Sequence, residues 1–107
     1  MTKIITKETF DLDVLEVSKE KPVLVDFFAQ WCMPCKMMAP ILDDLSEDVG
    51  EEAVIVKVDV DEERQLAEEF GIMSIPTMYI FREGKIVEKM VGLKAQEELK
   101  TMLDSHK

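Results

Sequence analysis

Residues 22–36 decide the fold, and they read PVLVDFFAQWCMPCK. Residues 22–29 form a nearly continuous apolar run, which is typical of a central strand covered on both faces of a parallel sheet. Residues 31–49 then carry apolar side chains at helical spacing. The sequence therefore predicts a buried strand that leads directly into a helix. Both cysteines of the chain, Cys32 and Cys35, lie at that junction.

The helix predicted over residues 31–49 is expected to bury one face. Its apolar side chains recur every three or four residues, at Met38, Ile41, Leu42, Leu45 and Val49. Gly50 suits the end of the helix, and Pro40 predicts a kink inside it.

The neighbouring segments continue this alternation of strands and helices. Residues 3–6 predict a short first strand, and residues 8–18 predict a helix. On the other side, residues 53–58 predict a second buried strand. Asp59 and Asp61 follow it and are expected to cap a short acidic helix.

The last third of the chain changes pattern. Residues 77–82 and 86–91 predict two strands joined by a tight turn, which is an antiparallel hairpin, and residues 94–105 predict a final helix. The order β-α-β-α-β-α-β-β-α predicts an α/β fold with a mixed central sheet and helices on both faces. We expect residues 1–107 to form a single domain.

The composition excludes several classes of protein. The net charge of −10 argues against nucleic acid and against anionic membranes as partners. No apolar run approaches the length of roughly 20 residues that a membrane helix needs. Residues 1–7 are too short and too charged to hold the apolar stretch of a signal peptide. We therefore expect a cytoplasmic protein.

The spacing of the two cysteines points to chemistry. A disulfide between Cys32 and Cys35 would close almost no loop, so it would add little stability. The start of a helix has unpaired N–H groups and a partial positive charge, and both favour a thiolate there. We expect Cys32 to be the exposed, attacking sulfur, and Cys35, one turn deeper, to be the shielded, resolving sulfur. Pro34 suits a first helical turn.

Other roles for the pair are weaker. A zinc site needs four ligands, and the only histidine, His106, is near the C-terminal end. We therefore predict no metal in a single chain, although a site shared between two copies stays open. Two inert core cysteines are disfavoured, because Trp31 and Pro34 mark an exposed junction.

Further motifs accompany the dithiol along most of the chain. They are residues 25–36 with WCMPCK, then Ala39-Pro40, Lys57-Val58-Asp59, Ile75-Pro76-Thr77, Gly84 and Gly92. With these residues the chain closely resembles the thioredoxin family. Two positions depart from the usual motif: Met33 stands where the family mostly has glycine, and Phe28 where many members have tryptophan.

The resemblance implies roles for residues around the cysteines. Asp26 would be a buried carboxylate that takes or relays the proton of Cys35, and Lys57 would modulate it. The bond between Ile75 and Pro76 would be cis. The backbone of Ile75 would bind an extended substrate segment, and Pro76 would keep metal ions off the thiols.

The resemblance also implies an apolar surface around Cys32 that binds substrate. Its members would be Trp31, Met33, Pro34, Val60, Met73, Ile75, Val91 and Gly92. Methionine is flexible and polarizable, which suits a surface that binds varied partners. We hypothesise that Met33 and Met73 form a methionine-lined lip.

The function implied is reduction of protein disulfides through Cys32 and Cys35. The protein would be a redox-active reductase and electron carrier that needs no cofactor. It would act as a monomer and would be recharged by thioredoxin reductase or a similar electron donor. Two alternatives stay open: a related oxidase or isomerase, and a binding subunit whose dithiol is incidental. Pro34 favours a reductant over the first alternative, because oxidising relatives tend to carry histidine there.

The lip hypothesis makes a prediction for Met33→Gly. Removing the side chain takes apolar contact area from the rim, so binding to at least some disulfide substrates should weaken. The measurement is the Michaelis constant across a panel of disulfide substrates. Unchanged constants across the panel would contradict the hypothesis.

Overall fold

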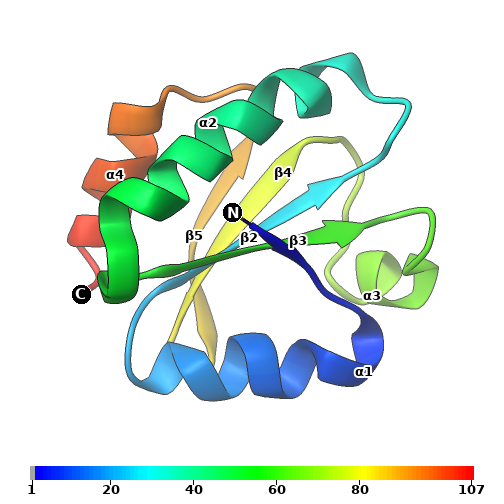
Figure 1. Cartoon of the computed structure of the whole chain (residues 1–107). Coiled ribbons are helices and arrows are strands. Elements are labelled where there is room, and N and C mark those ends of the chain that lie inside the picture. Colours follow the sequence, from blue (N-terminus) through cyan, green and yellow to red (C-terminus); the bar gives the residue numbers. More distant parts are fainter. Residues whose placement is uncertain (1) are drawn as a thin grey trace.

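Residues 2–107 are described by a computed structural model of the chain (Figure 1). Its elements are β1 (Lys3–Ile4), α1 (Lys7–Phe10), β2 (Val23–Phe28), α2 (Met33–Val49), β3 (Val54–Asp59), α3 (Arg64–Glu69), β4 (Thr77–Arg82), β5 (Lys85–Val91) and α4 (Gln96–Asp104). A π-helical segment (Asp11–Glu16) and a 3₁₀ turn (Val17–Lys19) continue α1, and a second 3₁₀ turn (Gly50–Glu52) follows α2. The predicted order of strands and helices is confirmed.

The five strands form one sheet in the order β1-β3-β2-β4-β5. β2 pairs in parallel with β3, and β3 with β1, whereas β4 pairs antiparallel with both β2 and β5. Every residue of β2 is buried, as expected for a central strand with a layer on each side. The mixed sheet with an antiparallel hairpin at one edge is therefore confirmed.

Helices cover both faces of the sheet, with α2 and α4 on one face and α1 and α3 on the other (Figure 1). The first face packs on apolar side chains that include Met38, Leu42 and Leu99. The second face holds a cluster of aromatic rings from Phe10, Phe27, Phe70, Tyr79 and Phe81. Core side chains on both sides hold β2 in place, and β2 carries the loop that leads to the cysteines.

The start of the third helix was predicted wrongly. α3 begins at Arg64 and not directly after Asp59. The reason is that Asp59 Oδ1 accepts hydrogen bonds from the backbone N–H groups of Asp61 and Glu62, at 2.9 and 3.3 Å. Asp59 therefore caps a tight turn that precedes the helix. Pro40 lies inside α2, as expected.

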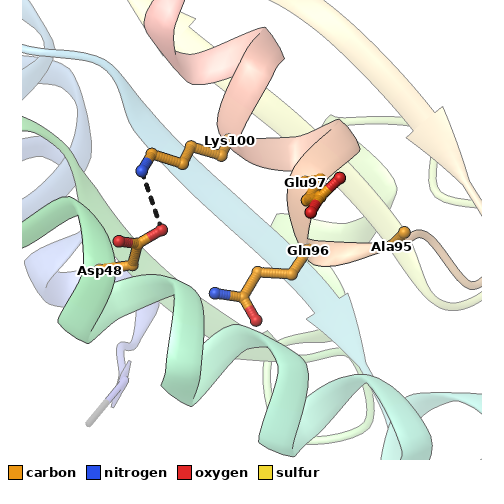
Figure 2. Close-up of a pocket in the computed structure, with 5 residues that line it drawn as sticks. All are labelled: Asp48, Ala95, Gln96, Glu97 and Lys100. Atoms are coloured by element: carbon orange, nitrogen blue, oxygen red, sulfur yellow. Dashed lines mark ion pairs between the residues drawn. The ribbon is translucent and has the colours of Figure 1, made fainter.

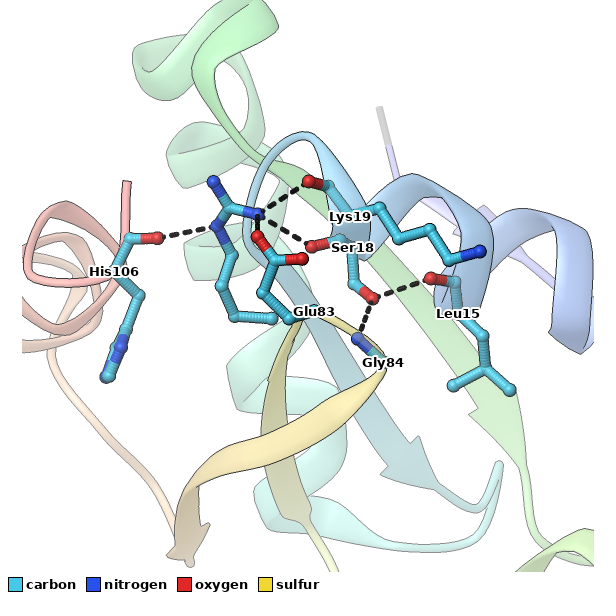
Figure 3. A network of polar contacts seen from close by, with 7 residues as sticks. Leu15, Ser18, Lys19, Glu83, Gly84 and His106 are labelled. Carbon is cyan, nitrogen blue, oxygen red and sulfur yellow. Dashed lines mark hydrogen bonds and ion pairs between the residues drawn. The ribbon is translucent and has the colours of Figure 1, made fainter.

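A polar network ties the hairpin to the segment after α1 (Figure 3). Ser18 is fully buried, and its Oγ donates to the Leu15 carbonyl at 2.7 Å and accepts from the Gly84 N–H at 2.9 Å. Arg82 donates to the carbonyls of Ser18 and His106, each at 2.9 Å. The network joins segments that are distant in sequence, and it fixes the turn end of the hairpin, opposite the end at which Thr77 pairs with Val91.

Across residues 2–107, no helix is both long enough and apolar enough to cross a membrane.

Because Ser18 is buried and hydrogen-bonded, we expect its hydroxyl to contribute to the free energy of unfolding. Ser18→Ala leaves the Gly84 N–H without its partner, so the free energy of unfolding should fall by about 1–3 kcal/mol. Ser105→Ala is the matched control, because the Ser105 hydroxyl makes a similar local bond on the exposed surface. Urea denaturation should show a change within about 0.5 kcal/mol for the control. A fall in the free energy of unfolding for Ser18→Ala that is as small as the change in the control would show that the network adds no stability.

Candidate functional site

The two cysteines lie at the start of α2, just after the loop that follows β2. Cys32 is the N-cap of α2, and the backbone N–H of Cys35 donates to Cys32 Sγ at 3.2 Å. Pro34 lies in the first turn of the helix, where its missing N–H removes no helical hydrogen bond. Cys32 and Cys35 form a disulfide, with Cα atoms 5.2 Å apart. A sulfur in this position is stabilised as an anion by the unpaired N–H groups of the helix.

The disulfide is more enclosed than the sequence predicted. Cys32 is only 4% exposed and Cys35 3%, so the prediction of an exposed Cys32 is wrong for the disulfide form. The cause is packing, because both cysteines form a buried cluster with Phe28 and Ala29, and Val60 and Ile75 pack against this cluster. The carbonyl oxygen of Ile75 lies 3.9 Å from Cys32 Sγ. A substrate therefore has to pass the apolar side chains of Val60 and Ile75 to reach Cys32.

Asp26 lies in the middle of β2 and is fully buried, as predicted. Among the described residues, neither of its carboxylate oxygens has a hydrogen-bond partner. Burial raises the pKa of Asp26 from 3.8 to about 7, and the positive charge of Lys57 opposes this rise. A carboxyl group with this pKa can gain or lose a proton near neutral pH.

Lys57 pairs with Asp26 in the register of β2 and β3. Its side chain is half-buried, and its Nζ lies 4.4 Å from the centre of the Phe28 ring. The cation rests on an aromatic face, which is a favourable arrangement. Phe28, Lys57 and Cys35 also line a pocket of about 230 Å³ with Ala29, Gln30, Lys36 and Ala39. The structure thus brings Lys57 and the deeper cysteine to one hollow.

The residues predicted to form the apolar surface differ in burial. Val60 and Ile75 are partly buried against the cluster that contains the disulfide, whereas Trp31, Met33, Met73 and Val91 are exposed. The bond between Ile75 and Pro76 is cis, as expected. The Gly92 N–H donates to the Pro76 carbonyl at 2.8 Å, which ties the end of β5 to this loop.

Three residues with a contact to Trp31 or with exposed apolar side chains were not predicted from the sequence as part of the site. Trp31 Nε1 donates to Asp61 Oδ2 at 2.8 Å, so Asp61 holds the exposed indole in place. Asp61 lies in the turn that Asp59 caps. Both aspartates were assigned to helix capping from the sequence, so the hydrogen bond from Trp31 was not predicted. Met37 and Leu93 are also exposed apolar side chains. Met37 could have been predicted, because it lies one helical turn after Met33 and therefore on the same face of the helix.

A larger hollow lies elsewhere, between α2 and α4 (Figure 2). It measures about 470 Å³, and its lining residues are Asp48, Ala95, Gln96, Glu97 and Lys100. Asp48 and Lys100 form an ion pair at 3.0 Å across it. Asp48 is sixteen residues after Cys32, or about 24 Å along a helix. The hollow is open and charged, and it has no reactive sulfur.

Within residues 2–107, no cluster of three or more histidine, cysteine, aspartate or glutamate side chains is arranged to hold a metal ion.

An α/β sandwich with a Cys-x-x-Cys pair capping the helix after its central strand defines a class of dithiol–disulfide oxidoreductases. The family model described as Thioredoxin matches residues 1–105. The chain belongs to the thioredoxin family, and it is a redox-active disulfide reductase of that family.

Individual relatives agree with this assignment over most of their length. A thioredoxin of Bacillus subtilis is 45% identical over 89 residues, which cover 83% of this chain and 86% of the relative. A thioredoxin of Listeria monocytogenes is 42% identical over 106 residues, 99% of each chain. Thioredoxin 1 of Synechococcus elongatus is 43% identical over 102 residues, 95% and 94% of the two chains.

Because the pKa of Asp26 is raised in the folded protein, we expect the free energy of unfolding to depend on pH. Its folded-state pKa is above 3.8, so between about 4 and 7 the folded protein binds more protons than the unfolded chain. Stability should therefore fall as the pH rises through this range. Between about pH 5 and pH 8, the wild type should lose about 2–3 kcal/mol more than Asp26→Asn, whose amide does not ionise.

Urea denaturation of both proteins in the disulfide form measures this difference, because the cysteines do not titrate in that form. A difference between the two proteins that stays constant with pH would show that Asp26 has an ordinary pKa.

Proposed function

We propose that the chain reduces disulfide bonds in protein substrates, with Cys32 as the nucleophile and Cys35 as the resolving thiol. The observation that carries the proposal is the hydrogen bond from the Cys35 N–H to Cys32 Sγ. In the reduced protein the same donor faces a thiolate, and a hydrogen bond to a charged acceptor is stronger than one to a neutral acceptor. The reactive anion is thus favoured at position 32.

The first step is attack by the Cys32 thiolate on one sulfur of the substrate disulfide. A new bond forms between Cys32 Sγ and that sulfur, and the substrate S–S bond breaks. Its second sulfur leaves as a thiolate that takes a proton from solvent. The product of this step is a mixed disulfide between substrate and protein.

The second step is attack by Cys35 on Cys32 Sγ. Cys35 gives its proton to the Asp26 carboxylate, and the internal disulfide forms while the remaining substrate sulfur leaves as a thiolate. A pKa of about 7 leaves roughly half of the Asp26 carboxyl groups ionised at neutral pH, so a base is present. Lys57 increases that fraction, because its charge lowers the pKa of Asp26. The pocket beside Cys35 and Lys57 gives solvent a route toward this proton.

Substrate binding is assigned to the rim and to the backbone beside it. The exposed side chains of Trp31, Met33, Met73 and Val91 offer apolar contact area. The backbone of Ile75, next to Cys32 Sγ, suits strand-like hydrogen bonds to an extended segment. Val60, Pro34, Pro76 and Gly92 complete this surface.

The proposal extends to the setting of the reaction. Residues 1–107 would act as one domain and as a monomer, recharged by thioredoxin reductase or a similar electron donor. A reduced dithiol persists in a reducing compartment, which favours the cytoplasm. Equilibration against glutathione distinguishes a reductant from an oxidase or isomerase, because their potentials differ by tens of millivolts or more.

The matched pair Cys35→Ser and Cys32→Ser tests the two roles. Cys35→Ser should form a lasting mixed disulfide with a substrate peptide, because the resolving sulfur is gone. Its turnover in insulin reduction should fall on the order of 100-fold or more. Cys32→Ser should form no adduct and show no turnover. Mass spectrometry and the insulin assay measure both results. Undiminished turnover of Cys35→Ser would favour a binding subunit with an incidental dithiol.

A further inference from the structure

Three methionines are exposed in segments that carry or adjoin residues of the disulfide site, Met33 and Met37 in the first turns of α2 and Met73 in the loop before β4. The exposed fraction is 65% for Met33, 55% for Met37 and 96% for Met73. By contrast, Met38 and Met78 are fully buried in the core. The eight methionines of the chain thus include a group that fills the core and a group that faces solvent.

The exposed group lies in two separate segments, the first turns of α2 and the loop before β4. Met33 follows Cys32 directly, and Met37 lies one turn further along α2, on the same helical face. Met73 is two residues before Ile75, whose carbonyl oxygen lies 3.9 Å from Cys32 Sγ. Helix and loop therefore each place an exposed methionine within two residues of a group that lies at the disulfide.

We propose that Met33, Met37 and Met73 are a modification site, at which hydroperoxides form methionine sulfoxides and thereby weaken the docking of protein disulfides. The inference rests on the proposed function, since Met33 and Met73 belong to the surface assigned there to substrate binding, and Met37 extends that surface by one turn of α2. Each thioether sulfur attacks one peroxide oxygen. An S=O bond forms as the O–O bond breaks, so the sulfur loses two electrons and hydrogen peroxide is reduced to water.

The disulfide form is the state in which this modification occurs. Cys32 and Cys35 are then 4% and 3% exposed, and neither is a thiolate that competes for peroxide. Among the methionines of residues 2–107, Met33, Met37 and Met73 have the large exposed fractions. Oxidation turns an apolar, flexible side chain into a polar one, so the rim loses its ability to exclude water from a bound substrate.

The pattern of oxidation is the first test. The disulfide form is treated with hydrogen peroxide, and each methionine is followed by peptide mapping and mass spectrometry. Met73 should oxidise fastest, with Met33 and Met37 next, in the order of exposure. Met38 and Met78 should remain at least about tenfold slower, because folded packing excludes the peroxide. Equal rates for buried and rim methionines would overturn the proposal.

The second test concerns substrate reactions. The treated protein is reduced with dithiothreitol and freed of it, and the oxidation of its dithiol is followed by the fluorescence of Trp31, the only tryptophan. The second-order rate constant with insulin should fall about tenfold, equivalent to about 1.4 kcal/mol. The rate constant with 5,5′-dithiobis(2-nitrobenzoate), which is too small to cover the rim, should change less than about twofold.

The triple variant Met33→Leu, Met37→Leu and Met73→Leu isolates the rim. Leucine keeps the apolar character but has no sulfur to oxidise. Each protein is compared with its own untreated sample, so a changed starting rate does not matter. Peroxide should leave the insulin rate of the triple variant unchanged. In Met102→Leu, the substitution control on α4, peroxide should still lower the rate about tenfold, as in the wild type.

The outcomes separate this inference from the proposed function. An untreated protein that fails to reduce insulin would refute the proposed function itself. An active protein whose insulin rate survives complete oxidation of the rim would refute only the inference. Loss of the rate in the triple variant as well, or loss of the folded-state circular dichroism on treatment, would also refute it, because the effect would then come from elsewhere.

Discussion

The hydrogen bond from the Cys35 N–H to Cys32 Sγ joins the fold to the chemistry. A helix that follows a central strand needs a cap, and here the capping atom is the sulfur that reacts. β2 is buried on both faces and paired on both edges, so the loop that it carries has a fixed origin. The core side chains of α2 fix the direction in which the N–H groups of the helix point.

Two environments lie within a few residues of each other at this junction. Asp26 is held without a hydrogen-bond partner among the described residues, and its pKa is raised to about 7 by burial. Cys32 is offered N–H donors instead. The first environment disfavours a charge and the second favours one. A carboxyl group that can gain or lose a proton near neutral pH and a sulfur that is stabilised as an anion therefore lie on consecutive elements, β2 and the start of α2.

Much of this was predictable from the sequence, and the parts that were not have physical reasons. The run of residues 22–29 predicted β2 and its burial, because continuous apolar character requires cover on both faces. The resemblance predicted that Ile75 lies near Cys32, but the burial of Cys32 depends on how closely Val60 and Ile75 pack there, which the sequence does not show. The hydrogen bond from Trp31 to Asp61 was not predictable either, because Asp61 is positioned by the turn after β3 that Asp59 caps.

The most direct test of the central claim is the rate of Cys32 alkylation by iodoacetamide as a function of pH, in the reduced protein. If the N–H groups of α2 stabilise the thiolate, the midpoint of the curve should lie at least about one pH unit below that of free cysteine, whose pKa is about 8.5. A midpoint at or above that of free cysteine would contradict the claim, because the helix would then not favour the reactive anion.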